Sequence, residues 1–202
     1  MRLTINPDNP QLRLVRHVVD SLRQGGVVIY PTDTTYGLGC DIFNTKGVKK
    51  IYQIKQRDPR KPFSFICNDL AEVANYAQVS NFAFRILKRY LPGPYTFILE
   101  ATKIVPDSLT TRQKTVGIRI PDNAISRMIV QELGHPLVTT SANISGEHAI
   151  QDPALIDDRM ERMVDMVVDG GISMGVESSV ISLIDDRIEV LRVGAGDLSW
   201  ID

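Results

Sequence analysis

The sequence predicts an α/β protein with an open, twisted, mixed sheet and helices packed against it. Short apolar runs rich in β-branched residues, such as VVIY at 27–30, are typical of buried strands. Amphipathic stretches, such as 12–22, have the helical period. The two kinds of segment interleave without a strict βαβ rhythm, which favours a mixed sheet. No repeat or Gly/Ser-rich linker divides the 202 residues, so we expect one domain over residues 1–202.

The same patterns predict each element in chain order. They predict a helix over 12–22, a strand over 27–30, a hydroxyl- and glycine-rich loop over 31–39, a basic helix around 48–54, a strand over 63–67, a helix over 82–87, strands over 95–99 and 115–120, a helix over 123–133, a strand over 136–141, a helix over 153–163, and strands over 166–169, 178–183 and 188–193. We expect Asn68 and Ser80 to cap the helices that follow them. Residues 185–187 read as a hairpin turn.

Composition narrows the class of protein. A hydrophobic fraction of 43% with 23% charged residues is ordinary for a globular chain and excludes a mainly disordered one. No apolar run approaches the roughly 20 residues that cross a bilayer, and the first residues lack the apolar segment of a secretory signal. Cys40 and Cys67 are too few for a disulfide framework. We therefore expect a cytoplasmic protein with reduced thiols and no membrane partner.

A net charge of −1 conceals an uneven distribution. From Gln151 onward, four arginines face twelve carboxylates, so the preceding part of the chain has an excess of cations. Seven of these cations lie within residues 46–61, where Asp58 is the one acid. Such a run attracts phosphates or polyanions. A solvated helix face is the alternative, and for an isolated lysine run it is the more common interpretation.

Several familiar catalytic patterns do not occur in the sequence. There is no GxxxxGK[ST] phosphate loop, no GxGxxG between a strand and a helix, and no HExxH. The three histidines, His17, His135 and His148, are scattered along the chain. A metal cluster or a Ser-His-Asp triad therefore has no support, and we expect no metal site.

Polar motifs at the ends of predicted elements are the remaining candidates for chemistry. They are PTDTTYGLG (31–39), IKQRDPRKPFSFI (54–66), TVGIRIP (115–121), TTSANISG (139–146), ESSV (177–180) and LRVGAGD (191–197). Glycines 37 and 39 let a ligand approach the backbone closely, and the cations of the second motif exceed what helix capping needs. Arg119 interrupts an apolar strand, so it pairs with an acidic neighbour or binds a ligand carboxylate. Each motif alone is more often structural, but together they indicate one composite ligand site.

Taken together, PTDTTYGLG, the Lys-x-Arg of KQR with the following KPF, GIRIP, TSANISG, ESSV and LRVG resemble the YrdC/YciO family. The match runs in order from about residue 10 to residue 196. This resemblance implies a YrdC-like sheet with a concave basic pocket and the activity of an L-threonylcarbamoyladenylate synthase. Such an enzyme combines L-threonine, bicarbonate and ATP with Mg²⁺, releases pyrophosphate and serves the t6A modification of tRNA at adenosine 37. No tightly bound cofactor is implied.

The resemblance also implies roles for individual residues. Catalysis falls to the cations Lys55, Arg57 and Lys61. ATP contacts fall to Arg57, Lys61, Thr115, Ser141, Asn143 and Arg192. Threonine contacts fall to Thr32, Thr34, Arg119, Thr139 and Ser178, with Arg119 meeting the carboxylate through two hydrogen bonds. Because the barrier is the approach of an anion to a polyanion, cations and hydroxyls suit this chemistry without a nucleophilic side chain.

Departures from the family pattern suggest an alternative function. The KPFSFIC and PGPYTFIL blocks are closer to the YciO branch, and residues 147–150 replace a continuation that often carries a further serine. The alternative is a protein that binds double-stranded RNA, tRNA or the ribosome and has weak or no synthase activity. Aromatic residues make up 6% of the chain, and no RNA-module signature occurs, which counts against it. Proteins of the t6A pathway are expected partners under the first interpretation.

Overall fold

The computed structural model describes residues 1–56, 63–106, 109–110 and 113–201. The strands are β1 (Arg2–Thr4), β2 (Val27–Tyr30), β3 (Gly37–Asp41), β4 (Ser64–Ile66), β5 (Tyr95–Glu100), β6 (Thr115–Arg119), β7 (Leu137–Ser141), β8 (Met166–Asp169), β9 (Ser179–Ser182) and β10 (Glu189–Arg192). The helices are α1 (Leu12–Arg23), α2 (Thr45–Lys55), α3 (Leu70–Tyr76), α4 (Asn81–Tyr90), α5 (Ala124–Leu133) and α6 (Asp158–Met163), with short 3-10 helices η2 (Pro153–Leu155) and η3 (Ile184–Asp186). No described helix is both long and apolar enough to span a membrane.

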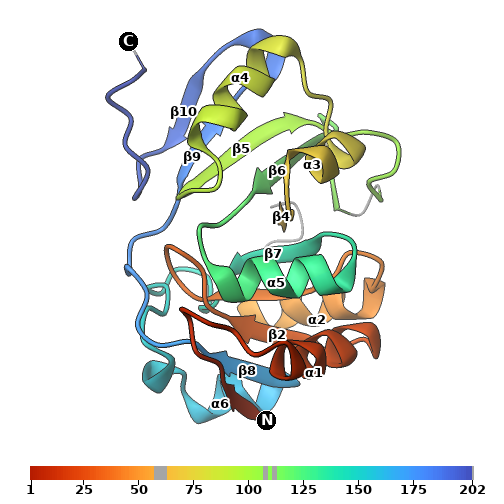
Figure 1. The fold of residues 1–202 in the computed structure, drawn as a ribbon, viewed down its shortest axis with the longest axis vertical. Helices are drawn as coiled ribbons and strands as arrows, with labels where there is room; N and C mark the ends of the chain where they lie inside the picture. Colours follow the sequence, from red (N-terminus) through yellow and green to blue (C-terminus); the bar gives the residue numbers. More distant parts are fainter. Residues whose placement is uncertain (57–62, 107–108, 111–112, 202) are drawn as a thin grey trace.

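The strands form one mixed sheet, which confirms the predicted fold class (Figure 1). Its order within the described chain is β1-β8-β2-β3-β7-β4-β6-β5-β9-β10. The pairs β1–β8, β2–β8, β4–β6 and β5–β9 are parallel, and the remaining pairs are antiparallel. The sheet has β1 and β10 at its two edges, and the strands from the middle of the chain, β7, β4, β6 and β5, lie together between them.

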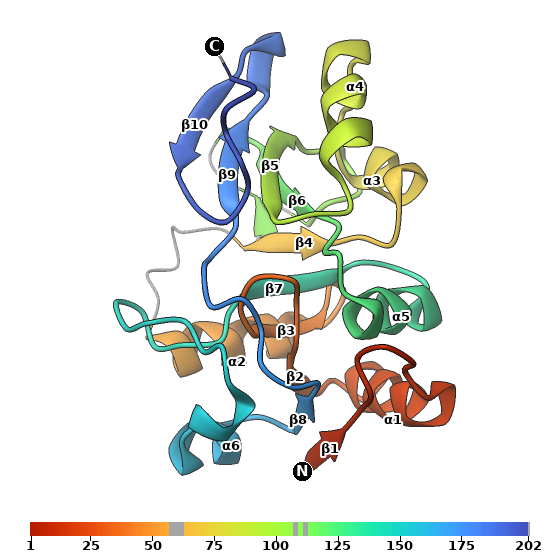
Figure 2. The same ribbon diagram turned by 60° about the vertical axis from the view of Figure 1, so that its left-hand side comes forward.

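Alternation along β2 shows how both faces of the sheet are covered. Val27 and Ile29 belong to a large apolar cluster that includes the buried side of α2. Val28 and Tyr30 belong to a second cluster that joins the strand to α1 and α5. Figure 2 shows α2 on one side of this part of the sheet and α1 with α5 on the other. The four-residue apolar run is therefore a strand buried on both faces.

Alternation along β5 leads from the core to a cavity. Phe97 and Leu99 face the large cluster, which includes the buried residues of α3 and α4. Thr96 and Ile98 point the other way and line a cavity. β9 repeats this arrangement, with Ile181 in the core and Val180 on the cavity wall. The period of two in a strand thus gives this end of the sheet one apolar face and one face available to a ligand.

Most helix starts follow the expected capping chemistry, with one correction. Ser80 caps α4, because its Oγ accepts a hydrogen bond from the Ala83 N–H at 3.1 Å. The cap of α3 is Asp69 and not Asn68: Asp69 Oδ1 accepts from the Glu72 N–H at 2.8 Å. Asn68 instead donates its own backbone N–H to Glu72 Oε2 at 2.6 Å. The cap thus lies one residue later than predicted, and the Glu72 carboxylate satisfies the N–H of the residue before it.

Three boundaries differ from the sequence-based expectations. The predicted loop of residues 31–39 ends early, because Gly37–Asp41 forms β3 between β2 and β7. β1 was not predicted, since its three residues are ordered as a strand by parallel pairing with β8. The predicted helix over 153–163 divides into η2 and α6, the latter capped by Asp157. The predicted hairpin at 185–187 is confirmed, with η3 joining the antiparallel strands β9 and β10.

Candidate functional site

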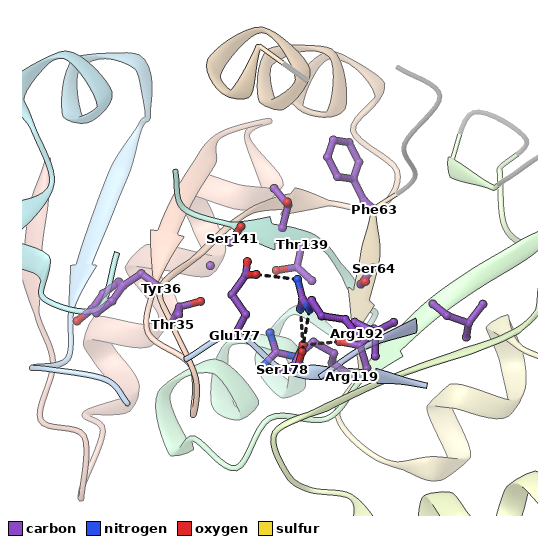
Figure 3. A pocket seen from close by; sticks show the side chains of 15 residues that line it. Thr35, Tyr36, Phe63, Ser64, Arg119, Thr139, Ser141, Glu177, Ser178 and Arg192 are labelled. Atoms are coloured by element: carbon purple, nitrogen blue, oxygen red, sulfur yellow. Dashed lines mark hydrogen bonds and ion pairs between the residues drawn. The ribbon is translucent and has the colours of Figure 1, made fainter. Parts of the chain in front are cut away.

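A cavity of about 240 Å³ lies where residues from widely separated parts of the chain meet (Figure 3). Arg119 comes from the end of β6, Thr139 and Ser141 from β7, and Arg192 from β10. Ser178 directly precedes β9. All five were predicted site residues, and the sheet order brings them to one wall although up to 73 positions separate them in the sequence. The cavity is also lined by Thr35, Tyr36, Ser64 and Glu177, which belong to the predicted polar motifs without an assigned role, and by Thr96, which does not.

The loop that follows β2 builds a cradle for Arg119. One guanidinium nitrogen, Nη2, donates to Asp33 Oδ1 and to Thr34 Oγ1, both at 3.0 Å. Thr32 Oγ1 lies 3.1 Å from Thr34 Oγ1 and donates to the Thr35 carbonyl at 2.6 Å. Thr32 and Thr34 are buried behind the cavity and do not line it. The Thr34 hydroxyl therefore holds Arg119 directly, and the Thr32 hydroxyl holds the loop beside Thr34.

Its position in an apolar strand predicts that Arg119 either pairs with an acidic neighbour or faces a ligand, and the structure shows both an acidic partner and a place on the cavity. It forms an ion pair with Asp33 in which both side chains are about nine-tenths buried, at 11% and 10% exposure. It also lines the cavity. Its buried Nε has no hydrogen-bond partner among the described residues. Because a buried donor without an acceptor is costly, this N–H is a candidate contact for an anionic ligand.

Arg192 reaches the cavity because of a bulge in β10. Val190 pairs with Ile181 and Arg192 with Val180, so Leu191 is the extra residue. In a regular strand Arg192 would share the face of Val190, whereas the bulge turns it onto the face of Val180, which lines the cavity. Its Nε donates to the Ser178 carbonyl at 3.0 Å. The bulge thus places a cation beside the residues that precede β9.

Lys55 lies beneath the loop that follows β7. It is 2% exposed, and its Nζ donates to the carbonyls of Ser141 and Asn143 at 2.6 and 2.8 Å and to Asn143 Oδ1 at 2.8 Å. Ser141 Oγ donates to the same Oδ1 at 2.6 Å. The Ser145 N–H in turn donates to the Lys55 carbonyl at 2.9 Å. This geometry gives Lys55 a role in positioning the loop. Because Lys55 also lines a cavity of about 600 Å³ beside the first, the substrate contact that the resemblance implied stays a prediction.

The remaining predicted residues lie outside the first cavity or outside the described chain. Asn143 lines a neighbouring cavity of about 600 Å³ that shares Ser141 and Glu177 with the first. Thr115 lines another of about 340 Å³, which shares Phe63, Ser64 and Ile98 with the first. These shared walls make the three cavities neighbours on one side of the sheet. The predicted cations Arg57 and Lys61 lie outside the described residues.

The glycines of β3 make room for packing, and Gly37 also lines the first cavity, so the expected close approach of a ligand to its backbone stays a prediction. A Cβ on Gly37 would lie 2.9 Å from Tyr30 Cζ, and one on Gly39 would lie 2.5 Å from the Val138 carbonyl. Because these glycines have no side chain, the Tyr30 ring can pack against β3. The Tyr30 hydroxyl donates to Thr139 Oγ1 at 2.6 Å. Burial raises the pKa of Tyr30 well above its ordinary value, so the phenol stays protonated. Thr139 therefore accepts from Tyr30 and keeps its own proton to donate.

The described parts of the chain contain neither a cluster of metal ligands nor an exposed thiol. No three His, Cys, Asp or Glu side chains there are grouped so as to hold a metal ion. Both cysteines are buried. Burial raises the pKa of the Cys40 thiol to about 12, which keeps it uncharged and unreactive near neutral pH. The polar side chains that line the first cavity are the two arginines, Glu177 and a set of hydroxyls.

Comparisons with known sequences identify one family. The model of the Sua5/YciO/YrdC family, described as "Telomere recombination", matches residues 20–194. The uncharacterized protein YciO of Escherichia coli is 42% identical over 196 residues, which are 96% of this chain and 95% of YciO. A putative threonylcarbamoyl-AMP synthase of Methanocaldococcus jannaschii is 37% identical over 184 residues, covering 90% of this chain and 86% of that protein.

Solved structures give the same result. The crystal structure of E. coli YciO superposes with a TM-score of 0.94 at 41% identity, covering 98% of both chains. Sua5 of P. abyssi, crystallised in complex with L-threonine, gives a TM-score of 0.90 at 28% identity, covering 96% of this chain and 57% of that one. A family model that spans most of the chain and relatives of this similarity leave one conclusion. The chain belongs to the Sua5/YciO/YrdC family.

Proposed function

We propose that this protein forms L-threonylcarbamoyladenylate from L-threonine, bicarbonate and ATP, with release of pyrophosphate, for the t6A modification of tRNA. The relative from M. jannaschii is named a putative threonylcarbamoyl-AMP synthase, and the P. abyssi relative was crystallised with L-threonine. The observation that carries the proposal is the convergence of Arg119, Arg192 and the hydroxyl side chains of Thr139, Ser141 and Ser178 on one cavity. Such a wall suits a ligand that carries a carboxylate and phosphates.

The reaction divides into two steps. The threonine amine and bicarbonate first combine to a carbamate with loss of water. A carbamate oxygen then attacks the α-phosphorus of ATP, the bond from that phosphorus to the bridging oxygen breaks, and pyrophosphate leaves with the electron pair. ATP enters as its Mg²⁺ complex, which is part of the substrate. No side chain needs to act as a nucleophile, so positioning and charge stabilisation supply the catalysis.

The cavity offers separate groups for each part of the substrates. Arg119 binds the threonine carboxylate, using the buried Nε that lacks an acceptor among the described groups. Thr139 donates its hydroxyl proton on the same wall. Arg192 binds a phosphate through Nη1, whose partner in the described chain is the exposed Glu177 carboxylate, while its Nε is fixed on Ser178. Ser141 lies between the first cavity and the larger one, where the rest of the nucleotide extends.

The direct test is pyrophosphate release from MgATP and bicarbonate with L-threonine, with L-serine and with no amino acid. We expect release that requires threonine. Arg119→Gln should lower kcat/KM for threonine about 100-fold, because a buried charge-assisted contact contributes about 3 kcal/mol. Arg16→Gln is the matched control, since Arg16 pairs with Glu132 at 3.0 Å on the exposed surface away from the cavity. Full activity of folded Arg119→Gln, or no release from the folded parent under any condition, would contradict the proposal.

A further inference from the structure

Glu177 places a negative charge at a wall that otherwise suits anions. Among the described residues that line the first cavity it is the single carboxylate, beside Arg119, Arg192 and neutral groups. It also lines the larger neighbouring cavity, and Ser141 is the other residue shared by the two. A ligand that extends from one cavity into the other therefore passes Glu177. Figure 3 shows its side chain directed at Arg192.

The guanidinium of Arg192 has one fixed edge and one exchangeable edge. Its Nε and Nη2 donate to the carbonyl and hydroxyl of Ser178 at 3.0 and 3.2 Å. Ser178 is buried, and its Oγ lies 2.8 Å from Thr96 Oγ1, so this edge is held by the sheet. The other edge, Nη1, donates to Glu177 Oε2 at 2.8 Å. The ligand-facing edge of Arg192 is thus occupied by a carboxylate from the same chain.

The contact between Glu177 and Arg192 is weak enough to be replaced. Their side chains are 40% and 41% exposed. Exposed ion pairs contribute about 0–1 kcal/mol, because solvent screens the charges and both long side chains lose freedom. A phosphate on Arg192 makes stronger, charge-assisted hydrogen bonds. When a phosphate replaces Glu177 on Arg192, the Glu177 carboxylate still lines both cavities. It therefore lies close to the bound phosphates and repels them.

We propose that Glu177 makes this site select metal-complexed ATP over free ATP. The inference rests on the proposed function, which brings ATP to this cavity. Free ATP carries about four negative charges near neutral pH and MgATP about two, so the repulsion from one nearby carboxylate is about twice as large for free ATP. Glu177 therefore lowers the affinity for the free polyanion more than the affinity for the reactive complex.

Equilibrium binding of ATP tests this inference. Titration calorimetry compares the parent chain and Glu177→Gln, each with ATP in excess EDTA and with ATP in excess Mg²⁺, at about 0.1 M salt. We expect Glu177→Gln to tighten binding of free ATP about tenfold and binding of MgATP about threefold. Glu161→Gln is the matched control, because Glu161 pairs with Arg2 at 2.8 Å with similar exposure on α6 and should change neither affinity.

Each outcome decides between explanations. An unchanged ratio of the two affinities in Glu177→Gln overturns the inference and leaves the proposed function intact. Selective loss of MgATP binding also overturns it, because Glu177 would then be a ligand of the metal. If the folded parent binds ATP in neither condition, the inference falls together with the proposed function. Threonine-dependent pyrophosphate release, measured in parallel, separates the failure of one from the failure of both.

Discussion

At the scale of single residues, the buried Lys55 ammonium holds the loop that follows β7. Its ammonium satisfies three oxygens of residues 141 and 143, all within 2.8 Å. We expect Lys55→Met to lower the free energy of unfolding by about 3 kcal/mol, because it leaves buried acceptors without a donor. Activity should fall as well, since Ser141 and Asn143 lose their support. Urea unfolding and pyrophosphate release measure the two effects.

The control lies on the same helix. Lys49 is exposed on α2, so Lys49→Met should change neither stability nor activity. If Lys55→Met unfolds at the same urea concentration as the parent and yet is inactive, Lys55 contacts the substrate and the positioning role is wrong. The resemblance alone could not decide between these roles, because a motif gives the residue type and not the direction of the side chain.

At the scale of elements, Asp165 connects three parts of the fold. Its Oδ2 accepts from the Val27 N–H at 2.7 Å, at the start of β2, and from Lys50 Nζ of α2 at 2.8 Å. Burial alone raises the pKa of Asp165, but the hydrogen bonds from Lys50 and Val27 outweigh it, and the net direction is downward. The carboxylate therefore stabilises the fold above about pH 4, and that contribution is lost as the pH falls through its lowered pKa.

Stability measured against pH checks this connection. Between pH 7 and pH 3 the parent should lose more free energy of unfolding than Asp165→Asn, by at most about 1 kcal/mol, because the side chain is 43% exposed. Asp158→Asn serves as the reference, since Asp158 is 93% exposed and lies 4.0 Å from Arg162. Equal pH dependence in the parent and Asp165→Asn would show that the contact contributes nothing to stability.

The sequence predicts helices and strands well where a segment has one clear hydrophobic period. It predicts them less well where a strand forms only because it pairs with strands distant in the sequence. The apolar stripe of α1 and the run of β2 confirm the expected segments. β3 was missed because Gly37 and Gly39 are typical of loops, although here they make room for the Tyr30 ring. The bulge at Leu191 was equally hidden, since the alternation of residues 188–193 alone would direct Arg192 away from the cavity.

At the scale of the whole molecule, the candidate site follows the sheet order more than the sequence order. The cavity wall joins β6, β7 and β10, and the hairpin of β9 and β10 reaches it by parallel pairing of β9 with β5. Arg119, Ser141 and Arg192 could be predicted because their motifs resemble a family. Asp33, Thr96 and Glu177 could not, because their importance comes from contacts with Arg119, Ser178 and Arg192.

Folding also brings the basic and acidic parts of the sequence into contact. The acidic carboxyl-terminal part meets the basic amino-terminal part directly, through Lys50 with Asp165 and Arg2 with Glu161, each at 2.8 Å. Lys55 is buried, so two of the cations counted in the basic run are already engaged. Lys46 and Lys49 remain exposed on α2. The basic run therefore offers an RNA less charge than its sequence suggests, and RNA binding stays a prediction.

Salt dependence tests the RNA-binding alternative on the whole protein. We expect affinity for a short double-stranded RNA no tighter than about 1 μM near 0.15 M salt, which is typical of non-specific contacts. Lys46→Gln with Lys49→Gln should lower the slope of log affinity against log salt by about two, because each lost phosphate contact contributes about 0.9. Threonine-dependent pyrophosphate release should not change, since both lysines lie outside the cavity walls. Submicromolar binding that resists about 0.5 M salt and survives in the double variant would instead indicate a dedicated RNA site and favour the alternative function.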